Sequence, residues 1–519
     1  MANPSLQIGN SNWAIKESNL LGYSTAGTRF VPQPITMTRA SAGTRVNPQG
    51  LIETVELLGS ELVTNGDFAT DTDWTKGTGW TISGGKAIYT GTANASLNQS
   101  NALISGKFYK LQYEVISSSL DGNFKISGVT ESAQSPLSQS VGTHTVYFTA
   151  DGSAPTNIAL RVVFNTTGTL EIDNVSVKES TKNNLARVDY DGTASSLLVE
   201  PQRTNRFLYS EDLTQFDLSS SGTGALNPTV TSNYGVSPDG TQNADRVQFN
   251  AGTDSSGNSR ITESFTIFAT EETISVYLKS NDNQEHTIDI IQSNQAQNSV
   301  TVTTEWQRFS FSNVNGSPDK YGIGLTGGNA ETADILAWGF QLEQASYPTS
   351  YIPTSGSTVT RVQDQYTKTG ISNLINSEEG VLFIEMAAFT DDNDGSKSIS
   401  LSSGGYSDNI IIQYTTNTNQ IVFKTSPAHS TPIYQPFTVS DITQDSKMAF
   451  NFKNNDCSFW HNGIKLGSVS SFTPFSVGTL NVLNFNRGDG GEDFEGKVKQ
   501  LQVFKTALTD SELIALTTI

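Results

Sequence analysis

The sequence has few of the residues from which reactive sites are most often built. Its 519 residues contain one cysteine, Cys457, and four histidines. A single cysteine excludes a disulfide within the chain and a cysteine-based metal cluster, and we expect it to be an apolar side chain in a strand. The histidines lie far apart, without the spacing of paired metal ligands. The sequence also lacks a G-x-S-x-G elbow and a Walker loop, so nucleophilic and nucleotide chemistry are not expected.

Charged residues are also scarce, and most of them are acidic. They make up 16% of the chain, and 51 acidic against 31 basic residues give a formal net charge of −20. Such a charge repels nucleic acids and anionic membrane surfaces, so neither is an expected partner. No stretch approaches the roughly 20 apolar residues of a membrane span, and the first residues lack the pattern of a secretory signal. We therefore expect assembly inside the cell and no membrane insertion.

The residues that are abundant favour strands and turns. Glycine, serine, threonine and asparagine dominate, a composition typical of short strands joined by polar turns, and the length predicts several domains. Two regions share one pattern of apolar residues alternating with polar ones, shifted by 163 positions. The matching residues are Leu111, Tyr113 and Val115 in the first region and Ile274, Val276 and Leu278 in the second. This agreement predicts two tandem copies of one β-sandwich.

The last strand of each copy carries a further prediction. In the first copy the apolar phase slips after Ile172, which predicts a β-bulge. In the second copy Leu336, Trp338, Phe340 and Leu342 alternate cleanly with other residues, so Trp338 is expected in the core.

The C-terminal region has a different pattern. Asn462-Gly463 is a favoured hairpin turn between two strands. Near the end, Thr509 and Glu512 form a capping box, which predicts a short helix that begins at Asp510.

Several stretches resemble known β-sandwich families. The Asn-Gly-Asp-Phe opening at 65–68 and the Asp-Asn-Val-Ser-Val-Lys-Glu ending at 173–179 resemble jelly-roll carbohydrate-binding modules. The G-x-V-x-x-L-x-V run from 496, followed by Ala-Leu-Thr-Asp-Ser-Glu-Leu, resembles the laminin-G or concanavalin-A-like sandwich. The implied fold class is all-β: tandem jelly-roll sandwiches, then a concanavalin-A-like sandwich, with a small irregular N-terminal anchor. The expected parts are an anchor segment at 1–57, the first jelly roll at 58–182, a clasp at 183–206, the second jelly roll at 207–345, a linker at 346–370 and the concanavalin-A-like sandwich at 371–519.

Two further segments resemble a junction found in virion fibre and appendage proteins of tailed bacteriophages. They are TRASAGTRVNPQGLIETV at 38–55 and ARVDYDGTASSLLVEPQRTNRFLYSE at 186–211. In that family the two segments are nearly continuous, so the first jelly roll is predicted to be an insertion, with Val55 and Leu185 close in space. Arginines are expected to hold this split clasp to its neighbours through carbonyl or carboxylate groups. They are Arg45, Arg187, Arg203, Arg206 and Arg361.

Two kinds of binding site are suggested by residue type. Tryptophan rings stack on sugars, so Trp74, Trp80 and Trp460 are candidate glycan-binding residues, with a place in the core as the alternative for each. Acidic residues in two loops, without EF-hand spacing, are either solvated or ligands of Ca²⁺. They are Asp391, Asp392 and Asp394 in one loop and Asp489 and Asp493 in the other. No catalytic residue is assigned.

The leading hypothesis is a structural virion protein, not an enzyme, that displays glycan- or protein-binding sandwiches for attachment to the host surface. The resemblance implies assembly in the host cytoplasm, contact with other virion proteins through 1–57, and a homo-oligomer, with a trimer favoured. The alternative is a phage-associated polysaccharide depolymerase, a glycoside hydrolase or lyase, because two acids suffice for such chemistry. A bacterial adhesin is a third option, which the absence of a signal peptide disfavours.

Overall fold

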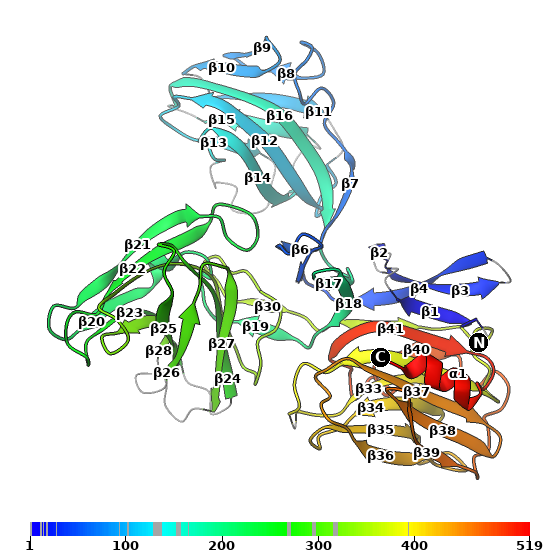
Figure 1. Ribbon diagram of the computed structural model, residues 1–519. Coiled ribbons are helices and arrows are strands. Elements are labelled where there is room, and N and C mark those ends of the chain that lie inside the picture. The colour runs from blue at the N-terminus through cyan, green and yellow to red at the C-terminus, as the bar shows by residue number, and fades with distance from the viewer. Residues whose placement is uncertain are drawn as a thin grey trace. The chain divides into compact units, whose positions relative to one another are not determined.

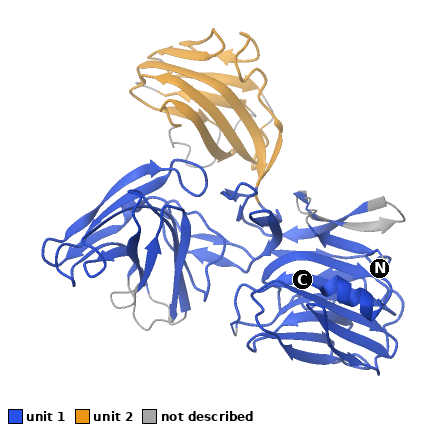
Figure 2. Cartoon of the chain, viewed as in Figure 1, with its two compact units in different colours: residues 1–55, 183–519 blue, residues 56–182 orange. Residues whose placement is uncertain are grey.

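The regular secondary structure of the protein consists almost entirely of antiparallel strands, which confirms the all-β prediction (Figure 1). The computed structural model describes residues 3–519, except 11–12, 14, 17–18, 27–28, 93, 101–102, 128–136, 152–156, 164–165, 267–270, 293–296, 315–319 and 393. The chain divides into two compact units (Figure 2). We call residues 1–55 with 183–519 the core unit, and residues 56–182 the inserted unit.

The inserted unit is a two-sheet sandwich. Its strands are β7 (Leu57–Glu61), β8 (Thr75–Lys76), β9 (Trp80–Ile82), β10 (Ala87–Gly91), β11 (Ala95–Ser100), β12 (Phe108–Ser118), β13 (Phe124–Ser127), β14 (Gly142–Thr149), β15 (Asn157–Val162) and β16 (Gly168–Thr181). One sheet has the order β14-β12-β16-β10-β9, with β7 also paired to β16, and the other has the order β13-β15-β11-β8. Alternate residues of the two sheets, such as Leu111 and Leu160, are fully buried between them and form one core.

The middle sandwich of the core unit repeats this topology. Its strands are β20 (Asp217–Ser221), β21 (Leu226–Gly235), β22 (Ala244–Asn250), β23 (Asn258–Ser264), β24 (Glu271–Ser280), β25 (His286–Gln292), β26 (Gln297–Val302), β27 (Gln307–Val314), β28 (Lys320–Thr326) and β29 (Thr332–Glu343). The sheet β27-β24-β29-β22-β21 matches β14-β12-β16-β10-β9 strand for strand, and β26-β25-β28-β23-β20 lies opposite. The internal repeat read from the sequence is therefore confirmed.

The bulge predicted near the end of the inserted unit is also present. The pairing of β12 with β16 shifts register between Gln112 and Glu114, opposite Asn174, whose φ is +51°. The same shift occurs between Ser275 and Tyr277 in the middle sandwich. Because both shifts lie at the same place in the repeat, the bulge belongs to the shared fold.

In the middle sandwich, the bulge shows that the predicted alternation of Leu336, Trp338, Phe340 and Leu342 on one face of the strand is wrong. Gly339 has a φ of +72°, which reverses the phase of β29. Ala337 and Phe340 therefore both face the sandwich core, whereas Trp338 turns away from it. Trp338 is buried instead in a separate cluster with Tyr351. The apolar residues at every second position of 336–342 do not reveal this reversal, because glycine has no side chain that would show which face of the sheet it is on.

The C-terminal sandwich follows. Its strands are β31 (Gln365–Lys368), β32 (Gly380–Ala387), β33 (Lys397–Ser402), β34 (Asn409–Tyr414), β35 (Gln420–Thr425), β36 (Tyr434–Thr438), β37 (Ser446–Lys453), β38 (Asp456–His461), β39 (Ile464–Val469), β40 (Val482–Asn484) and β41 (Gly496–Phe504). Cys457 is buried in its core, as expected. The predicted helix is α1 (Asp510–Thr517), and both hydrogen bonds of the Thr509–Glu512 capping box are present. Leu508 and Leu513 pack it against the sheet.

The N-terminal segment corrects the expectation of an irregular anchor. It contains β1 (Leu6–Gly9), β2 (Ile15–Lys16), β3 (Asn19–Ala26), β4 (Arg29–Thr38), β5 (Thr44–Val46) and β6 (Ile52–Thr54). Strand β1 pairs with β41, and β4 pairs with β31, so the segment extends the C-terminal sandwich (Figure 1). Leu6, Ile8 and Met37 are fully buried in that core. Pro32 and Pro34 lie in β4 opposite β3, outside the stretch that pairs with β31, so the edge of β4 facing β31 needs no backbone donor from them.

The clasp also joins this sheet. Strands β17 (Arg187–Asp191) and β18 (Ala194–Val199) form a hairpin, and β18 pairs with β41 beside β1. Within the core unit, the two chain ends that flank the insertion are held by one short segment. The Val55 amide donates to the Gly43 carbonyl at 3.0 Å, and the Asn184 amide donates to the Arg39 carbonyl at 2.8 Å. Within the inserted unit, Leu57 pairs with Thr181. Each unit thus has adjacent chain ends, which is the geometry that an insertion requires.

Replacing residues 56–182 with a short Gly-Ser linker should leave the core unit folded, because each unit has its own hydrophobic core. We expect the shortened chain to unfold cooperatively at the same urea midpoint as the core unit of the full chain. Residues 56–182 expressed alone provide the matched control and should show their own unfolding transition. A shortened chain without a cooperative transition would contradict the insertion.

Candidate functional site

Five charged side chains are buried together where the clasp meets the rest of the core unit. They are Arg39, Arg187, Arg361, Glu200 and Asp364, and none has more than 2% of its side chain exposed. We call this cluster the ionic junction. Burying charged groups is costly unless they are paired and hydrogen-bonded, so the pairing inside the cluster decides whether it is stable.

Asp364 links two arginines and a backbone amide. Its Oδ1 accepts a hydrogen bond from Arg39 Nη1 at 2.7 Å, and its Oδ2 forms an ion pair with Arg187 Nη2. The same Oδ2 accepts from the Glu200 amide at 2.9 Å. The carboxylate therefore joins the N-terminal segment, the clasp and the connector after the middle sandwich.

Glu200 is the second anion of the junction. It pairs with Arg187 Nη1 at 2.6 Å and Arg361 Nη1 at 2.9 Å, and it accepts hydrogen bonds from the amide and the hydroxyl of Ser350, each at 2.7 Å. Burial alone raises the pKa of Glu200. The attraction of Arg361 and Arg187, together with the Ser350 hydrogen bonds, outweighs burial and lowers this pKa to about 2. Glu200 is therefore ionised at neutral pH.

Local structure presents these groups to one another. Arg187 begins β17, and Glu200 follows β18 directly, so the hairpin brings both to the same end. Arg361 ends β30 (Val359–Arg361), which pairs with β19 (Arg203–Asn205) of the clasp. Arg361 Nη2 also donates to the Pro201 carbonyl at 2.9 Å. The β17–β18 and β19–β30 pairings thus bring Arg187, Glu200 and Arg361 together in the ionic junction.

The arginines named from the sequence have different partners. Arg187 and Arg361 lie in the ionic junction, and Arg45 pairs with Glu53 at 2.7 Å across the β5–β6 hairpin. Arg206 holds the clasp to the middle sandwich, because it forms an ion pair with Glu272 and donates to the Thr266 carbonyl at 2.6 Å.

Arg203 differs from its predicted role. It donates to the adjacent Gln202 carbonyl at 3.0 Å, and its guanidinium lies 5.6 Å from the centre of the Tyr347 ring. The sequence did not single out Arg39, Glu200 or Asp364 as members of the junction. A usable signal was present, because Asp364 follows the Arg361-Val362 step by two residues and Asp189 follows Arg187-Val188 directly.

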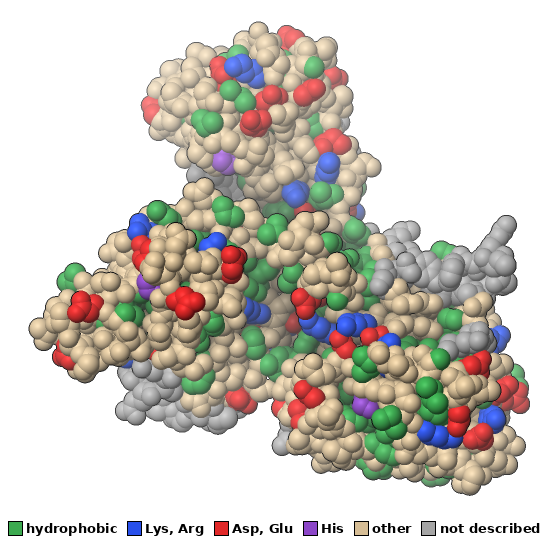
Figure 3. Space-filling model, in the orientation of Figure 1, with side chains coloured by type: hydrophobic (Ala, Val, Ile, Leu, Met, Phe, Trp, Pro, Cys, Tyr) green, Lys and Arg blue, Asp and Glu red, His purple; other side chains and the backbone are tan. Residues whose placement is uncertain are grey.

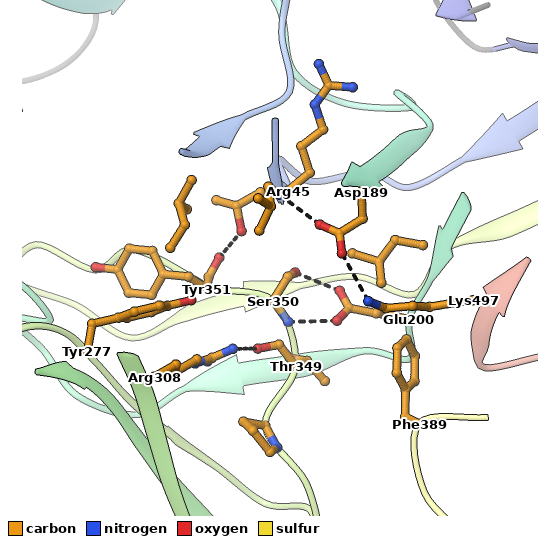
Figure 4. A pocket seen from close by; sticks show the side chains of 15 residues that line it. Arg45, Asp189, Glu200, Tyr277, Arg308, Thr349, Ser350, Tyr351, Phe389 and Lys497 are labelled. Atoms are coloured by element: carbon orange, nitrogen blue, oxygen red, sulfur yellow. Dashed lines mark hydrogen bonds and ion pairs between the residues drawn. The ribbon is translucent and has the colours of Figure 1, made fainter. Parts of the chain in front are cut away.

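A cavity of about 270 Å³ lies beside the junction (Figure 4). The clasp, the β5–β6 hairpin, the middle sandwich, the connector and the C-terminal sandwich all contribute to its walls. Its lining residues include Arg45, Asp189, Glu200, Tyr277, Arg308, Thr349, Ser350, Tyr351, Phe389 and Lys497. It is open beside Lys497 and Arg45, whose side chains are 42% and 20% exposed. Polar groups and aromatic rings together can hold a small polar ligand.

Most charges around the cavity are already paired. Asp189 accepts from the Val46 amide at 2.8 Å and pairs with Lys497 at 3.2 Å. Arg308 instead donates to neutral oxygens, the Thr349 carbonyl at 2.6 Å and the Ser275 hydroxyl at 2.9 Å. Burial raises the pKa of Tyr277, so its hydroxyl stays protonated at neutral pH.

The three tryptophans suggested as sugar platforms are in fact buried, which corrects that prediction. Trp74, Trp80 and Trp460 are 6%, 4% and 2% exposed. Trp74 and Trp80 belong to the core of the inserted unit, where their indole nitrogens donate to the carbonyls of Asn65 and Ala95. Trp460 packs under α1. Trp74 lies in a loop that folds its ring inward, whereas Trp80 in β9 and Trp460 in β38 (Asp456–His461) have inward-facing positions in strands.

Of the two alternatives for the acidic loops, solvated residues or Ca²⁺ ligands, the described residues do not support the second. Asp391 accepts from the Asn419 amide at 2.8 Å, and Asp392 accepts from the Ser346 hydroxyl at 2.6 Å. Asp391, Asp392 and Asp394 line an open cavity of about 600 Å³.

In the other loop, Asp489 pairs with Arg487 at 2.8 Å, and burial raises the pKa of Asp493. Among the residues that the structure describes, no three His, Cys, Asp or Glu side chains are placed to hold one metal ion. The prediction of Ca²⁺ ligands in these loops is therefore not supported.

No protein-family model matches the chain, and no curated protein matches it. Among solved structures, the carbohydrate-binding module CBM40 of a Ruminococcus gnavus sialidase, bound to α2,3-sialyllactose, is 18% identical; the match covers 27% of this chain and 83% of that one, with a TM-score of 0.24. Domain 4 of a GH43 arabinanase from Geobacillus stearothermophilus, in complex with arabinotriose, is 14% identical. That match covers 33% of this chain and 83% of that one, with a TM-score of 0.25. Trypanosoma rangeli sialidase is 9% identical, and the match covers 96% of this chain and 88% of that one, with a TM-score of 0.22. With TM-scores this low, the matches carry no argument about the function of this chain.

Substituting Asp364→Asn should destabilise the core unit by about 3–5 kcal/mol, because it removes the charge that compensates two buried arginines. Urea unfolding followed by tryptophan fluorescence measures the change. Asp489→Asn is the matched control, since Asp489 also pairs with an arginine but is partly exposed, and it should cost about 0–1 kcal/mol. Equal effects of the two substitutions would show that the junction does not stabilise the fold.

Acid should weaken the junction through Glu200. Its pKa is about 2 in the folded protein against 4.5 as the ordinary value, so its ionised form stabilises the fold. This stabilisation is complete above about pH 4.5 and is lost as the pH falls toward 2, and it amounts to about 3 kcal/mol. Urea midpoints measured from pH 6 to pH 2 test this expectation. Glu200→Gln should reduce the fall of the urea midpoint below about pH 4.5. A midpoint that falls with pH as in the unsubstituted chain would contradict the lowered pKa of Glu200.

Proposed function

We propose that the protein is a structural, non-enzymatic component of a bacteriophage virion, a fibre or appendage that displays glycan-binding β-sandwiches to the host surface. The observation that carries the proposal is the ionic junction. Three of its members, Arg39, Arg187 and Glu200, lie in the two segments that resemble the junction of virion fibre and appendage proteins. The segments that carry the resemblance thus supply three of the five charged residues of the ionic junction.

The arrangement suits display better than catalysis. Buried ion pairs with additional hydrogen bonds favour one geometry of the segments that they join, which a protein that presents binding domains needs. The net charge of −20 favours a neutral or weakly charged partner over nucleic acid. On the face drawn in Figure 3, acidic and basic side chains are interspersed. Among the described residues, no helix has the length and apolarity that would let it cross a membrane.

Immunogold labelling of phage particles that encode this chain tests the virion role. We expect gold on an appendage of the head or the tail, and particles without label would contradict the proposal. We further propose, from the same resemblance, that the chain forms a trimer, and light scattering of the purified chain tests this; a monomer would contradict it.

Incubation of the purified chain with host surface polysaccharide tests binding against catalysis. We expect the chain to be retained on the polysaccharide without release of reducing sugar, because no catalytic pair of acids is assigned. The alternative role, a depolymerase, predicts steady release of reducing ends. The heat-unfolded chain is the control for nonspecific retention.

A further inference from the structure

Arg308 has an uncompensated positive charge in the wall of the cavity beside the junction. Its two hydrogen bonds go to the neutral oxygens of Thr349 and Ser275, and its Nε is buried without a hydrogen-bond partner. Among the described residues, no carboxylate pairs with it, in contrast to Arg45 with Glu53 and Lys497 with Asp189. A partly buried cation without a counter-charge favours an anionic ligand, and a guanidinium binds a carboxylate particularly well.

Tyr277 supplies a second unused group. Its ring lies beside Arg308, with the guanidinium 5.4 Å from the ring centre. Figure 4 shows Tyr277 between Arg308 and Tyr351, with its hydroxyl directed toward the middle of the cavity. Within the described part of the chain, this hydroxyl makes no hydrogen bond. A tyrosine that packs its ring and leaves its hydroxyl free is suited to a polar ligand.

The remaining walls restrict the size and character of that ligand. Tyr351 and Phe389 add aromatic surface, whereas Asp189 and Lys497 place polar atoms near the opening. A volume of about 270 Å³ lies below the range of about 300–1,000 Å³ that drug-sized ligands occupy. One ring with hydroxyl groups, an apolar face and a carboxylate matches these walls.

We propose that this cavity binds one carboxylate-bearing sugar ring, such as a uronic acid unit of a surface polysaccharide, with Arg308 on the carboxylate and Tyr277 on a hydroxyl. The proposal rests on the glycan-binding part of the proposed function. The proposed sugar site belongs to the middle sandwich, and the described part of the inserted unit has no equivalent site. There the strand pair that corresponds to Tyr277 and Arg308 is Glu114 and Thr143, which offers no cation.

Isothermal titration of the full chain with D-glucuronate, with D-glucose as the neutral match and acetate as the carboxylate alone, tests the proposal. Glucuronate should bind at least about tenfold more tightly than either control, the effect of one charge-assisted hydrogen bond. Arg308→Gln should weaken glucuronate binding by about tenfold or more. Equal affinities for glucuronate and glucose would overturn the proposal.

Tyr277→Phe provides a second variant in case Arg308→Gln perturbs the fold, because the Tyr277 hydroxyl has no partner to lose among the described residues. It should weaken glucuronate binding and keep the urea midpoint. Tyr434→Phe, at a residue that is 61% exposed on β36, is the matched control and should change neither. Binding that survives both cavity substitutions would overturn the proposal.

Retention on host polysaccharide separates this inference from the proposed function. Retention that glucuronate does not compete away would overturn the cavity assignment and leave the proposed function intact. A chain that is retained on no polysaccharide and binds no glucuronate would overturn both.

Discussion

Asp364 accepts hydrogen bonds from Arg39 and Arg187 in the interior of the core unit, and the arrangement around it depends on that shared carboxylate. None of these charges is stable when buried alone, so each segment that brings one requires the others. Segments that start more than 300 residues apart in sequence therefore fold as one structure. The cavity beside the junction follows from the same constraint, because Ser350 is held by Glu200 and in turn fixes the connector that forms one wall.

The inserted unit adds a sandwich without disturbing this network. Both chain ends that leave the core unit are held by backbone hydrogen bonds to Arg39 and Gly43, close to the junction but outside its charged groups. The inserted unit and the middle sandwich share a strand order and a bulge, yet they use the outer face of the same sheet differently. In the middle sandwich that face carries Tyr277 and Arg308 and is lined by the connector. In the inserted unit the corresponding residues are Glu114 and Thr143.

Features that depend on neighbours in sequence could be predicted, whereas those that depend on distant pairing could not. The repeat, the bulge in the inserted unit and the capping box of α1 follow from local periodicity and hydrogen bonding. The pairing of β1 with β41 could not be seen, because it joins residues 6–9 to residues 500–503 and leaves no local pattern. The same limit applies to the tryptophans, since the burial of Trp74 depends on how its loop folds and that of Trp460 on the packing of α1 over β38. In the junction, Arg187 and Arg361 were found because each is followed by valine, as Arg45 is, whereas Arg39, Glu200 and Asp364 stand outside this repeated pair.

The pairing of β1 with β41 has a consequence for synthesis on the ribosome. Leu6 to Gly9 emerge long before their partners at Gln500 to Val503. At roughly 5–20 residues per second, this strand waits for roughly 25–100 s before it can pair with β41, although its pairing with β3 is available much earlier. Throughout that time, Leu6 and Ile8, which are fully buried in the finished protein, lack their final cover. The C-terminal sandwich therefore closes only after β41 has been synthesised, and products truncated before β41 leave one edge of β1 unpaired, which a chaperone or a protease can recognise.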